Sequence, residues 1–117
     1  MMQRRADILS RLARFEEPSG PLIEELRTMG WDWEGDPLLL LTEEHFLLVM
    51  DRFLGGSITA DQVVEWAENL EKREDIAFSQ EKAQVLDELL FCLANPAINY
   101  AITPDNIARL RDELVEG

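Results

Sequence analysis

Apolar residues recur at helical spacing along most of this chain, and helix start and stop signals divide the pattern into segments. No segment alternates between apolar and polar residues over a convincing strand length. Since the connections are short, neighbouring helices are expected to be mostly antiparallel. The pattern therefore predicts the all-α class, as a compact bundle of about five to six helices. They are expected at residues 2–16, 22–29, 43–54, 59–73, 80–94 and 104–115.

Several helix ends carry recognisable capping residues. Thr59 is followed three positions later by Gln62, a capping box in which each side chain satisfies the other residue's free backbone N–H. Thr103 and Pro104 combine an N-cap residue with a proline in the first helical position. Pro18 is expected to end the first helix, and residues 19–21 to form a turn before the second.

The apolar run at 38–41 fits two local structures. It is either a helical turn opened by Asp36 and Pro37 or an extended, buried segment. The pattern leaves both alternatives open.

Length and composition predict one domain over residues 1–117. Of the 117 residues, 46% are hydrophobic, enough for one core without a disulfide or metal. Cys92 is the single cysteine, which excludes an intramolecular disulfide and favours a reducing, cytoplasmic setting. The apolar runs are too short to span a bilayer, and the amphipathic start is not expected to be a signal peptide.

Charge is unevenly distributed along the chain, whose formal net charge is −13. Residues 1–15 hold four arginines and one aspartate, whereas residues 16–117 hold seven basic and twenty-three acidic residues. The domain is thus a basic amphipathic helix (1–16) and an acidic body (17–117). Such a body repels phosphate backbones, so nucleic-acid binding is not expected, and attracts cationic protein surfaces. Solubility alone is the other explanation for this acidity.

The residue types needed for nucleophilic catalysis are scarce. Cys92 stands among leucines, where a cysteine is usually a small core side chain, and His45 is expected on an exposed side of its helix. Adjacent carboxylates diverge around their helices, and no pair is singled out for acid–base chemistry. We therefore predict a protein that is not an enzyme.

One run of carboxylates resembles the ligand spacing of a calcium-binding loop. Asp32, Glu34, Asp36 and Glu43 match its oxygen positions, but Pro37 occupies the turn position that needs glycine. Clusters of histidine and cysteine are absent from the sequence. No metal and no cofactor are predicted.

Aromatic residues suggest two contact surfaces. Trp31 and Trp33 share a short segment with Asp32 and Glu34, a combination that suits a cationic partner unless the rings cover the core. Phe91 falls on the polar side of helix 80–94, where either another helix covers it or it anchors a partner.

The helix at 59–73 presents an acidic side. Glu65 and Glu68 are expected to face outward, together with Asp75 just beyond the helix. The arginines of helix 2–16 form a further charged side, which is either solvated or docked on the acidic body of this chain or of a second copy.

The segment FLGGSITADQVVEWA at 53–67 resembles small, acidic, all-helical bacterial proteins, most of them uncharacterised. It is similar to immunity proteins that neutralise toxin nucleases of the colicin D type, over roughly residues 42–76. The resemblance implies an acidic face that covers a toxin's basic, RNA-binding cleft. It assigns no individual inhibitory residue.

These observations favour a non-enzymatic module that binds a basic protein partner, with no nucleic acid and no membrane involved. The alternative is a self-associating structural or regulatory protein, a homodimer with Phe91 and the first helix at its interface. An enzyme that uses carboxylates in a helical cleft is a third hypothesis. The predicted partner-binding residues are Trp31, Asp32, Trp33, Glu34, Glu65, Glu68, Asp75 and Phe91.

Overall fold

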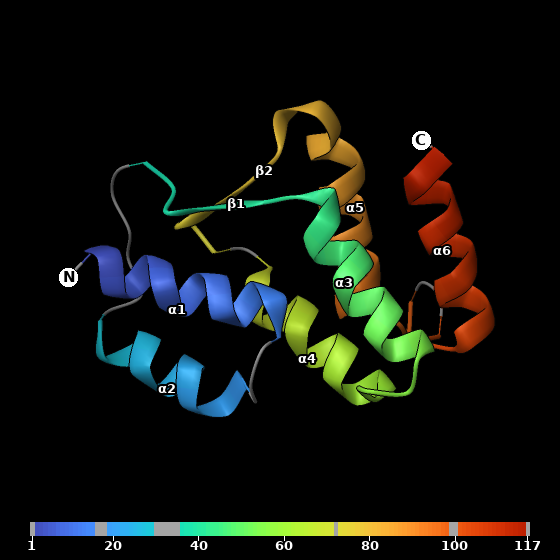
Figure 1. Cartoon of the computed structure of the whole chain (residues 1–117), viewed down its shortest axis with the longest axis horizontal. Helices are drawn as coiled ribbons and strands as arrows, with labels where there is room; N and C mark the ends of the chain where they lie inside the picture. Colours follow the sequence, from blue (N-terminus) through green and yellow to red (C-terminus); the bar gives the residue numbers. More distant parts are fainter. Residues whose placement is uncertain (1, 16–18, 30–35, 72, 99–100, 117) are drawn as a thin grey trace.

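The computed structural model describes residues 2–15, 19–29, 36–71, 73–98 and 101–116, and it confirms the all-α class (Figure 1). Helices dominate, and a small two-stranded sheet joins two of the connections. The elements are α1 (Met2–Arg14), α2 (Ser19–Thr28), β1 (Leu39–Leu41), α3 (Glu43–Leu54), α4 (Ala60–Leu70), β2 (Ile76–Phe78), the 3-10 turn η1 (Gln80–Lys82), α5 (Ala83–Ala94) and α6 (Pro104–Glu116).

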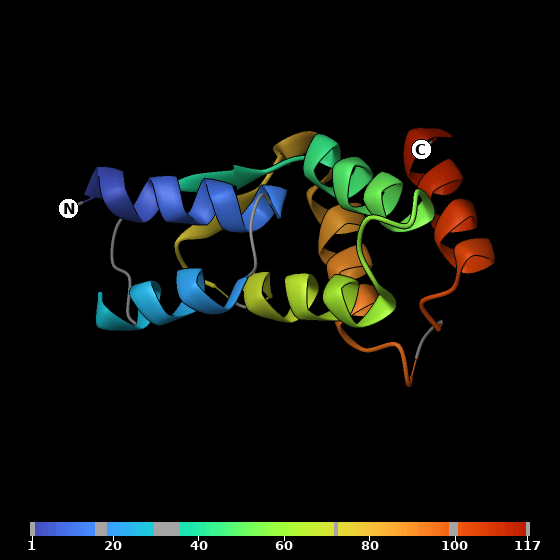
Figure 2. The same ribbon diagram turned by 60° about the horizontal axis from the view of Figure 1, so that its bottom comes forward.

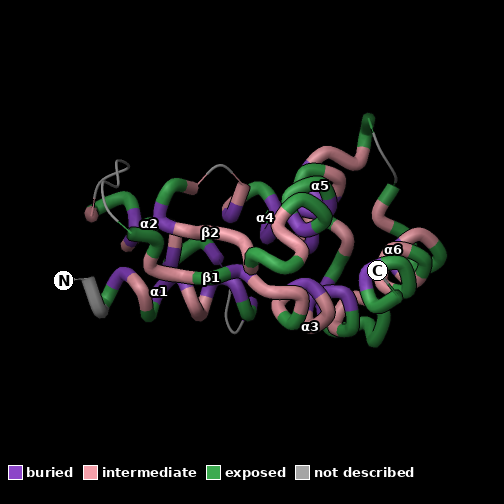
Figure 3. The backbone as a smooth tube through the Cα atoms, turned by 90° about the horizontal axis from the view of Figure 1, so that it is seen from above, coloured by how far each residue is buried: buried purple, intermediate pink, exposed green. Residues whose placement is uncertain are grey.

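The helices form two main layers, which Figure 2 shows edge-on. One layer holds α1, β1 and α3, and the other holds α2 and α4. Helix α5 packs against α4, and α6 packs against α3 at the far end from α1. Figure 3 colours each residue by its burial, and the buried residues lie where these elements face one another.

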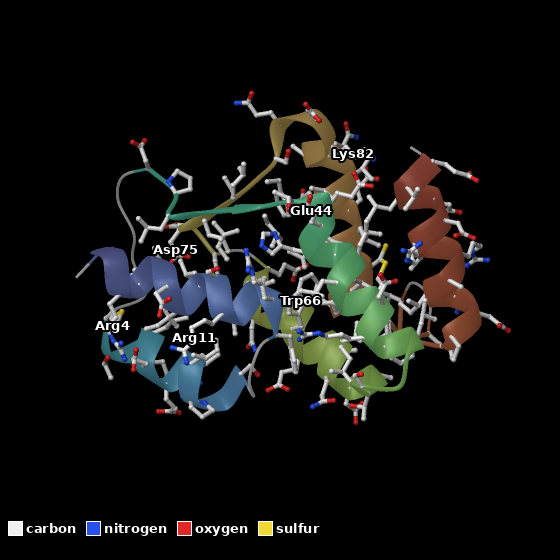
Figure 4. The ribbon with its side chains drawn as sticks, in the orientation of Figure 1. Arg4, Arg11, Glu44, Trp66, Asp75 and Lys82 are labelled. Carbon is white, nitrogen blue, oxygen red and sulfur yellow. The ribbon has the colours of Figure 1, made fainter. Side chains whose placement is uncertain are left out.

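Trp66 of α4 stands at the centre of the core and is fully buried. Its indole N–H donates to the carbonyl of Ala13 in α1 at 2.8 Å, so the one polar atom of the ring is satisfied (Figure 4). Phe46 of α3 meets the indole edge-on, with ring centroids 5.3 Å apart and an interplanar angle of 88°. Trp66 therefore joins three helices at one point.

Local capping chemistry fixes the starts of α3 and α4. In α4, Gln62 N–H donates to Thr59 Oγ1 and Thr59 N–H donates to Gln62 Oε1, at 3.2 and 2.8 Å, as the sequence predicts. In α3, the Thr42 N–H donates to Nδ1 of His45 at 3.0 Å. An imidazole thus takes the position that glutamine or glutamate usually holds in a capping box.

The prediction of a turn at residues 19–21 is wrong, because α2 already begins at Ser19. Pro21 lies in the first turn, where its missing N–H costs no helical hydrogen bond. Ser19 is buried, and its hydroxyl donates to Glu65 of α4 at 2.6 Å. Since Ser19 and Glu65 are 46 positions apart, local sequence patterns could not predict this contact between α2 and α4.

The run at 38–41 is extended rather than helical, and it pairs with a strand that the sequence pattern missed. Strands β1 and β2 run parallel in the register Leu39–Ile76, Leu40–Ala77 and Leu41–Phe78. Each has only three residues, too few for alternation to be recognised. Helix α4 ends at Leu70 rather than at residue 73, which leaves room for β2. The fifth helix is preceded by the 3-10 turn η1 and begins at Ala83 rather than at residue 80.

Lys82, just before α5, connects three elements. Its ammonium group lies 3.1 Å from Glu43 of α3 and donates to the carbonyl of Leu114 in α6 at 2.8 Å. In the part of the chain that the structure describes, no helix is both long and apolar enough to cross a membrane.

Candidate functional site

Phe91 projects from the outer side of α5, and 45% of the residue is exposed. Of the two alternatives for this residue, the structure therefore favours the exposed one. The ring borders a groove of about 590 Å³ between the end of α4, the strand β2 and α5. The groove is lined by Leu70, Glu71, Arg73, Ile76, Phe78, Asp87, Glu88, Phe91 and Cys92.

The lining divides into an apolar part and a charged part. Leu70, Ile76 and Phe78 continue from the hydrophobic core into the groove. Three carboxylates and the guanidinium of Arg73 form the charged part, and Phe91 and Cys92 complete the lining. An apolar surface bordered by excess negative charge suits a ligand that combines apolar side chains with lysine or arginine.

Asp75 anchors the chain directly before strand β2. Asp75 is only 1% exposed, so the prediction that it faces outward is wrong. Its Oδ2 accepts from Arg5 Nε at 2.8 Å, and Oδ1 accepts from Arg73 Nε at 2.9 Å. The Arg73 Nη2 also donates to Oδ2 at 2.9 Å. Asp75 is thus a buried residue that connects α1 to the segment between α4 and β2.

The pKa of Asp75 is lowered from its ordinary value despite burial. Desolvation by itself would raise the pKa, because it disfavours the charged carboxylate. The hydrogen bonds and positive charges of Arg73 and Arg5 outweigh that effect. The carboxylate therefore stays ionised at neutral pH and holds both arginines.

Arg73 is fixed at the edge of the groove by this arrangement. Two of its nitrogens bind Asp75, and its side chain is 11% exposed. Its charge is therefore largely compensated by Asp75, which leaves Glu71, Asp87 and Glu88 to set the sign of the groove's potential.

The two predicted acidic residues of α4 have different environments. Glu65 accepts the hydroxyl hydrogen bond of Ser19 and so faces the start of α2. Glu68 is exposed one turn before Glu71, which lines the groove. Glu68 can therefore extend the acidic border of the groove, whereas Glu65 belongs to the contact with α2.

A second, smaller groove of about 230 Å³ lies between α5 and α6. Glu88 and Cys92 line both grooves, so the exposed ridge of α5 separates them. Val85, which is exposed, belongs to this second groove. The ridge offers apolar side chains on both of its flanks, from Phe91 on one to Val85 on the other.

Cys92 is partly exposed rather than a core side chain, which corrects the expectation from its leucine neighbours. Desolvation raises the pKa of its thiol, and the negative charge of Glu88 adds to the increase. Less thiolate is then present at neutral pH than for a free cysteine. This is the opposite of the environment that activates a cysteine nucleophile.

His45 is half-buried, whereas the sequence places it on an exposed side. Burial lowers its pKa, and the charge of Arg14 lowers it further against the opposing effect of Glu44. Nδ1 accepts the Thr42 N–H, so the ring is neutral and its other nitrogen carries the proton. The imidazole thus acts as a helix cap.

The remaining predicted contact residues, Trp31, Asp32, Trp33 and Glu34, lie outside the described residues. So do Asp32 and Glu34 of the calcium-like spacing, whereas its Asp36 and Glu43 are described. Among the residues that the structure does describe, no group of three or more histidine, cysteine, aspartate or glutamate side chains could hold a metal ion.

The sequence identified Phe91 but missed most of its surroundings. Ile76 and Phe78 flank a small alanine, a spacing that places both side chains on one face of a strand. That signal covers three residues, and it becomes meaningful only once β1 is known to pair there.

No protein-family model, curated protein or solved structure matches this chain.

Proposed function

We propose that this protein is a non-enzymatic binding module that holds a basic protein partner in the groove beside Phe91. The observation that carries the proposal is an exposed aromatic ring next to an apolar surface, with Glu71, Asp87 and Glu88 around it. An aromatic anchor in a partly desolvated groove is the typical centre of a protein interface.

The charge of the chain supports the same partner chemistry. A net charge of −13 attracts a cationic protein from a distance and raises its association rate more than the final affinity. Affinity would then come from burial of Phe91 and of the apolar surface formed by Ile76 and Phe78. A partner with apolar residues flanked by lysine or arginine satisfies both requirements.

An immunity-like role is the most specific form of this proposal. The resemblance at 42–76 covers α3 and α4 and reaches the first residue of β2, so it includes the α4 wall of the groove. In that role the acidic groove would mask a cationic surface of a toxin nuclease in the cytoplasm. The single Cys92 suits a reducing compartment.

Self-association through the same face is disfavoured by charge. Two copies meeting at α5 would bring Glu71, Asp87 and Glu88 close to their own counterparts, and like charges oppose binding. Two arginines of α1 already have acidic neighbours in the same chain, because Arg4 lies 2.7 Å from Glu25 and Arg11 3.6 Å from Asp7. Figure 4 shows Arg4 and Arg11 on the side of α1 that faces α2.

The test combines capture and mutation. The immobilised chain is exposed to a host lysate at low salt, and a captured basic protein is purified for titration against variants. Phe91→Ser should weaken binding at least tenfold, whereas Ile98→Ser, at a residue that is 72% exposed, should leave it unchanged.

Charge reversal supplies the second arm. The double variant Glu71→Lys with Asp87→Lys should slow association and reduce its dependence on salt. The matched pair Glu24→Lys with Glu116→Lys changes the net charge equally at exposed positions away from the groove. Equal effects of the two pairs, with no effect of Phe91→Ser, would show that the groove is not the binding site.

A further inference from the structure

Strand β2 pairs with β1 along one of its edges only, as far as the described residues show. The Leu39 N–H donates to the carbonyl of Asp75 at 3.3 Å, and the Ser79 N–H donates to the carbonyl of Leu41 at 3.0 Å. Alternate residues of a strand direct their backbone groups to the same edge. Residues 75, 77 and 79 therefore face β1, and Ile76 and Phe78 face the opposite edge.

Four backbone groups on that outer edge lack a partner among the described residues. They are the N–H and the carbonyl of both Ile76 and Phe78, which form none of the hydrogen bonds found outside the helices and the β1–β2 pair. Such an edge is a ready template for another strand.

The open edge and the groove share their residues. Ile76 and Phe78 carry the unpaired backbone groups, and their side chains line the groove with Leu70 and Phe91. Where a peptide adds to a sheet edge, main-chain hydrogen bonds supply affinity and adjacent pockets select alternate side chains. Both parts are present at β2.

We infer that the basic partner enters this site as an extended segment that pairs with the outer edge of β2. This inference rests on the proposed function and specifies how the groove is used. Apolar side chains of the segment would lie against Phe78 and Phe91. The intervening residues would point to the other face of the added strand, where lysine or arginine favours association with a chain of net charge −13. A helical ligand would leave the backbone groups of Ile76 and Phe78 unsatisfied.

The charge pattern distinguishes this occupant from a second copy of the chain. The strands that the structure describes, Leu39–Leu41 and Ile76–Phe78, already pair with each other and contain no lysine or arginine. The net charge of −13 favours a segment of the opposite charge. The segment is thus a cationic, alternating sequence from another protein.

The test uses a fluorescein-labelled synthetic peptide of alternating lysine and valine, titrated against the full chain by fluorescence anisotropy at moderate salt. Two further peptides carry N-methyl groups, either on every valine or on every lysine. In an added strand, only one of these sets turns its N–H groups toward β2. That set should weaken binding about tenfold or more, because a net hydrogen bond contributes roughly 0.5–1.5 kcal/mol. The other set should bind almost as the parent peptide does.

Phe91→Ser separates the two proposals, with Ile98→Ser as the control. Binding that needs Phe91 but is insensitive to the position of the methyl groups would overturn strand addition and leave the proposed function intact. Absence of saturable binding would also overturn strand addition, while the capture experiment decides the function independently. Peptide binding that is unchanged in Phe91→Ser would overturn strand addition at this groove, and the capture experiment again decides the function. Dependence on Phe91 and on one methyl set alone is the supporting result.

Discussion

Arg5 and Asp75 form a buried ion pair, with 2.8 Å between Nε and Oδ2, although 70 positions separate them in the sequence. Figure 4 shows Asp75 beside α1, at the point where the chain turns from α4 into β2. The pair fixes that turn against α1, and Arg73, held by the same carboxylate, then lies at the edge of the groove.

Removal of the Asp75 charge should destabilise the fold strongly. In Asp75→Asn two guanidinium groups lose their compensating charge, and breaking a buried pair typically costs about 3–5 kcal/mol. Urea unfolding at pH 7 measures the change in the free energy of unfolding. Glu25→Gln, which removes the exposed ion pair with Arg4, is the control and should cost about 0–1 kcal/mol. Similar losses in the two variants would contradict the structural role of Asp75.

The Asp75 contribution should also disappear in acid. The folded-state pKa is lower than the unfolded one, so the unfolded chain takes up the proton first as the pH falls. The stabilisation is complete above pH of about 4 and is lost as the pH falls through the folded-state pKa. The difference in stability between wild type and Asp75→Asn should therefore narrow below that pH. A difference that stays constant down to about pH 2 would argue against an ionised Asp75.

Because of His45, the free energy of unfolding should decrease as the pH falls from 7 to 5. Its pKa is lowered in the folded state, so the unfolded chain binds the proton more readily and stability falls as the pH drops below about 6.5. Protonation also removes the acceptor for the Thr42 N–H. Urea midpoints across this range measure the effect.

The variant His45→Gln provides the control for that experiment. Glutamine accepts the N-cap N–H without titrating, as Gln62 does at the start of α4. As the pH falls from 7 to 5, the loss of stability should be smaller in this variant than in wild type. An unchanged decline would assign the pH dependence to other groups.

Trp66→Phe should cost about 2–4 kcal/mol, since it loses a buried hydrogen bond and leaves a cavity. The loss affects the contacts with both Ala13 and Phe46, so α1 and α3 are destabilised together. Thermal unfolding followed by circular dichroism gives the change. Leu54→Ala, at an exposed apolar position at the end of α3, should change stability much less.

Cys92 should react slowly with iodoacetamide at pH 7.5, more slowly than glutathione. The raised pKa leaves little thiolate, and the rate should keep increasing at pH values above 9.0, the ordinary pKa of the group. Because Cys92 lines the groove beside Phe91, the lysine–valine peptide should slow the reaction further. Glutathione in the same solution is the control, and a peptide-independent rate would contradict binding at this groove.

Local sequence determined the helices well, because capping and the i to i+4 spacing act within a few residues. Thr59 with Gln62 and the bounds 43–54 of α3 agree with the structure. Pro104, after Thr103, begins α6 as expected. The same local logic failed at Asp75, which the helical phase of Glu65 and Glu68 placed outside. Helix α4 ends at Leu70, so that phase no longer applied.

Tertiary structure alone decided β2, the burial of Asp75 and the groove at Phe91. Each depends on partners far along the chain: Leu39–Leu41 for β2, Arg5 for Asp75, and the end of α4 for Phe91. The strands are too short to carry a periodic signal, and a buried carboxylate is recognisable only when its arginines are in place. By itself the sequence determined the helices, the acidic charge and an aromatic residue on a polar face. Packing between distant segments decided which of these features come into contact, because the energies of tertiary contacts outweigh the local preferences of single residues.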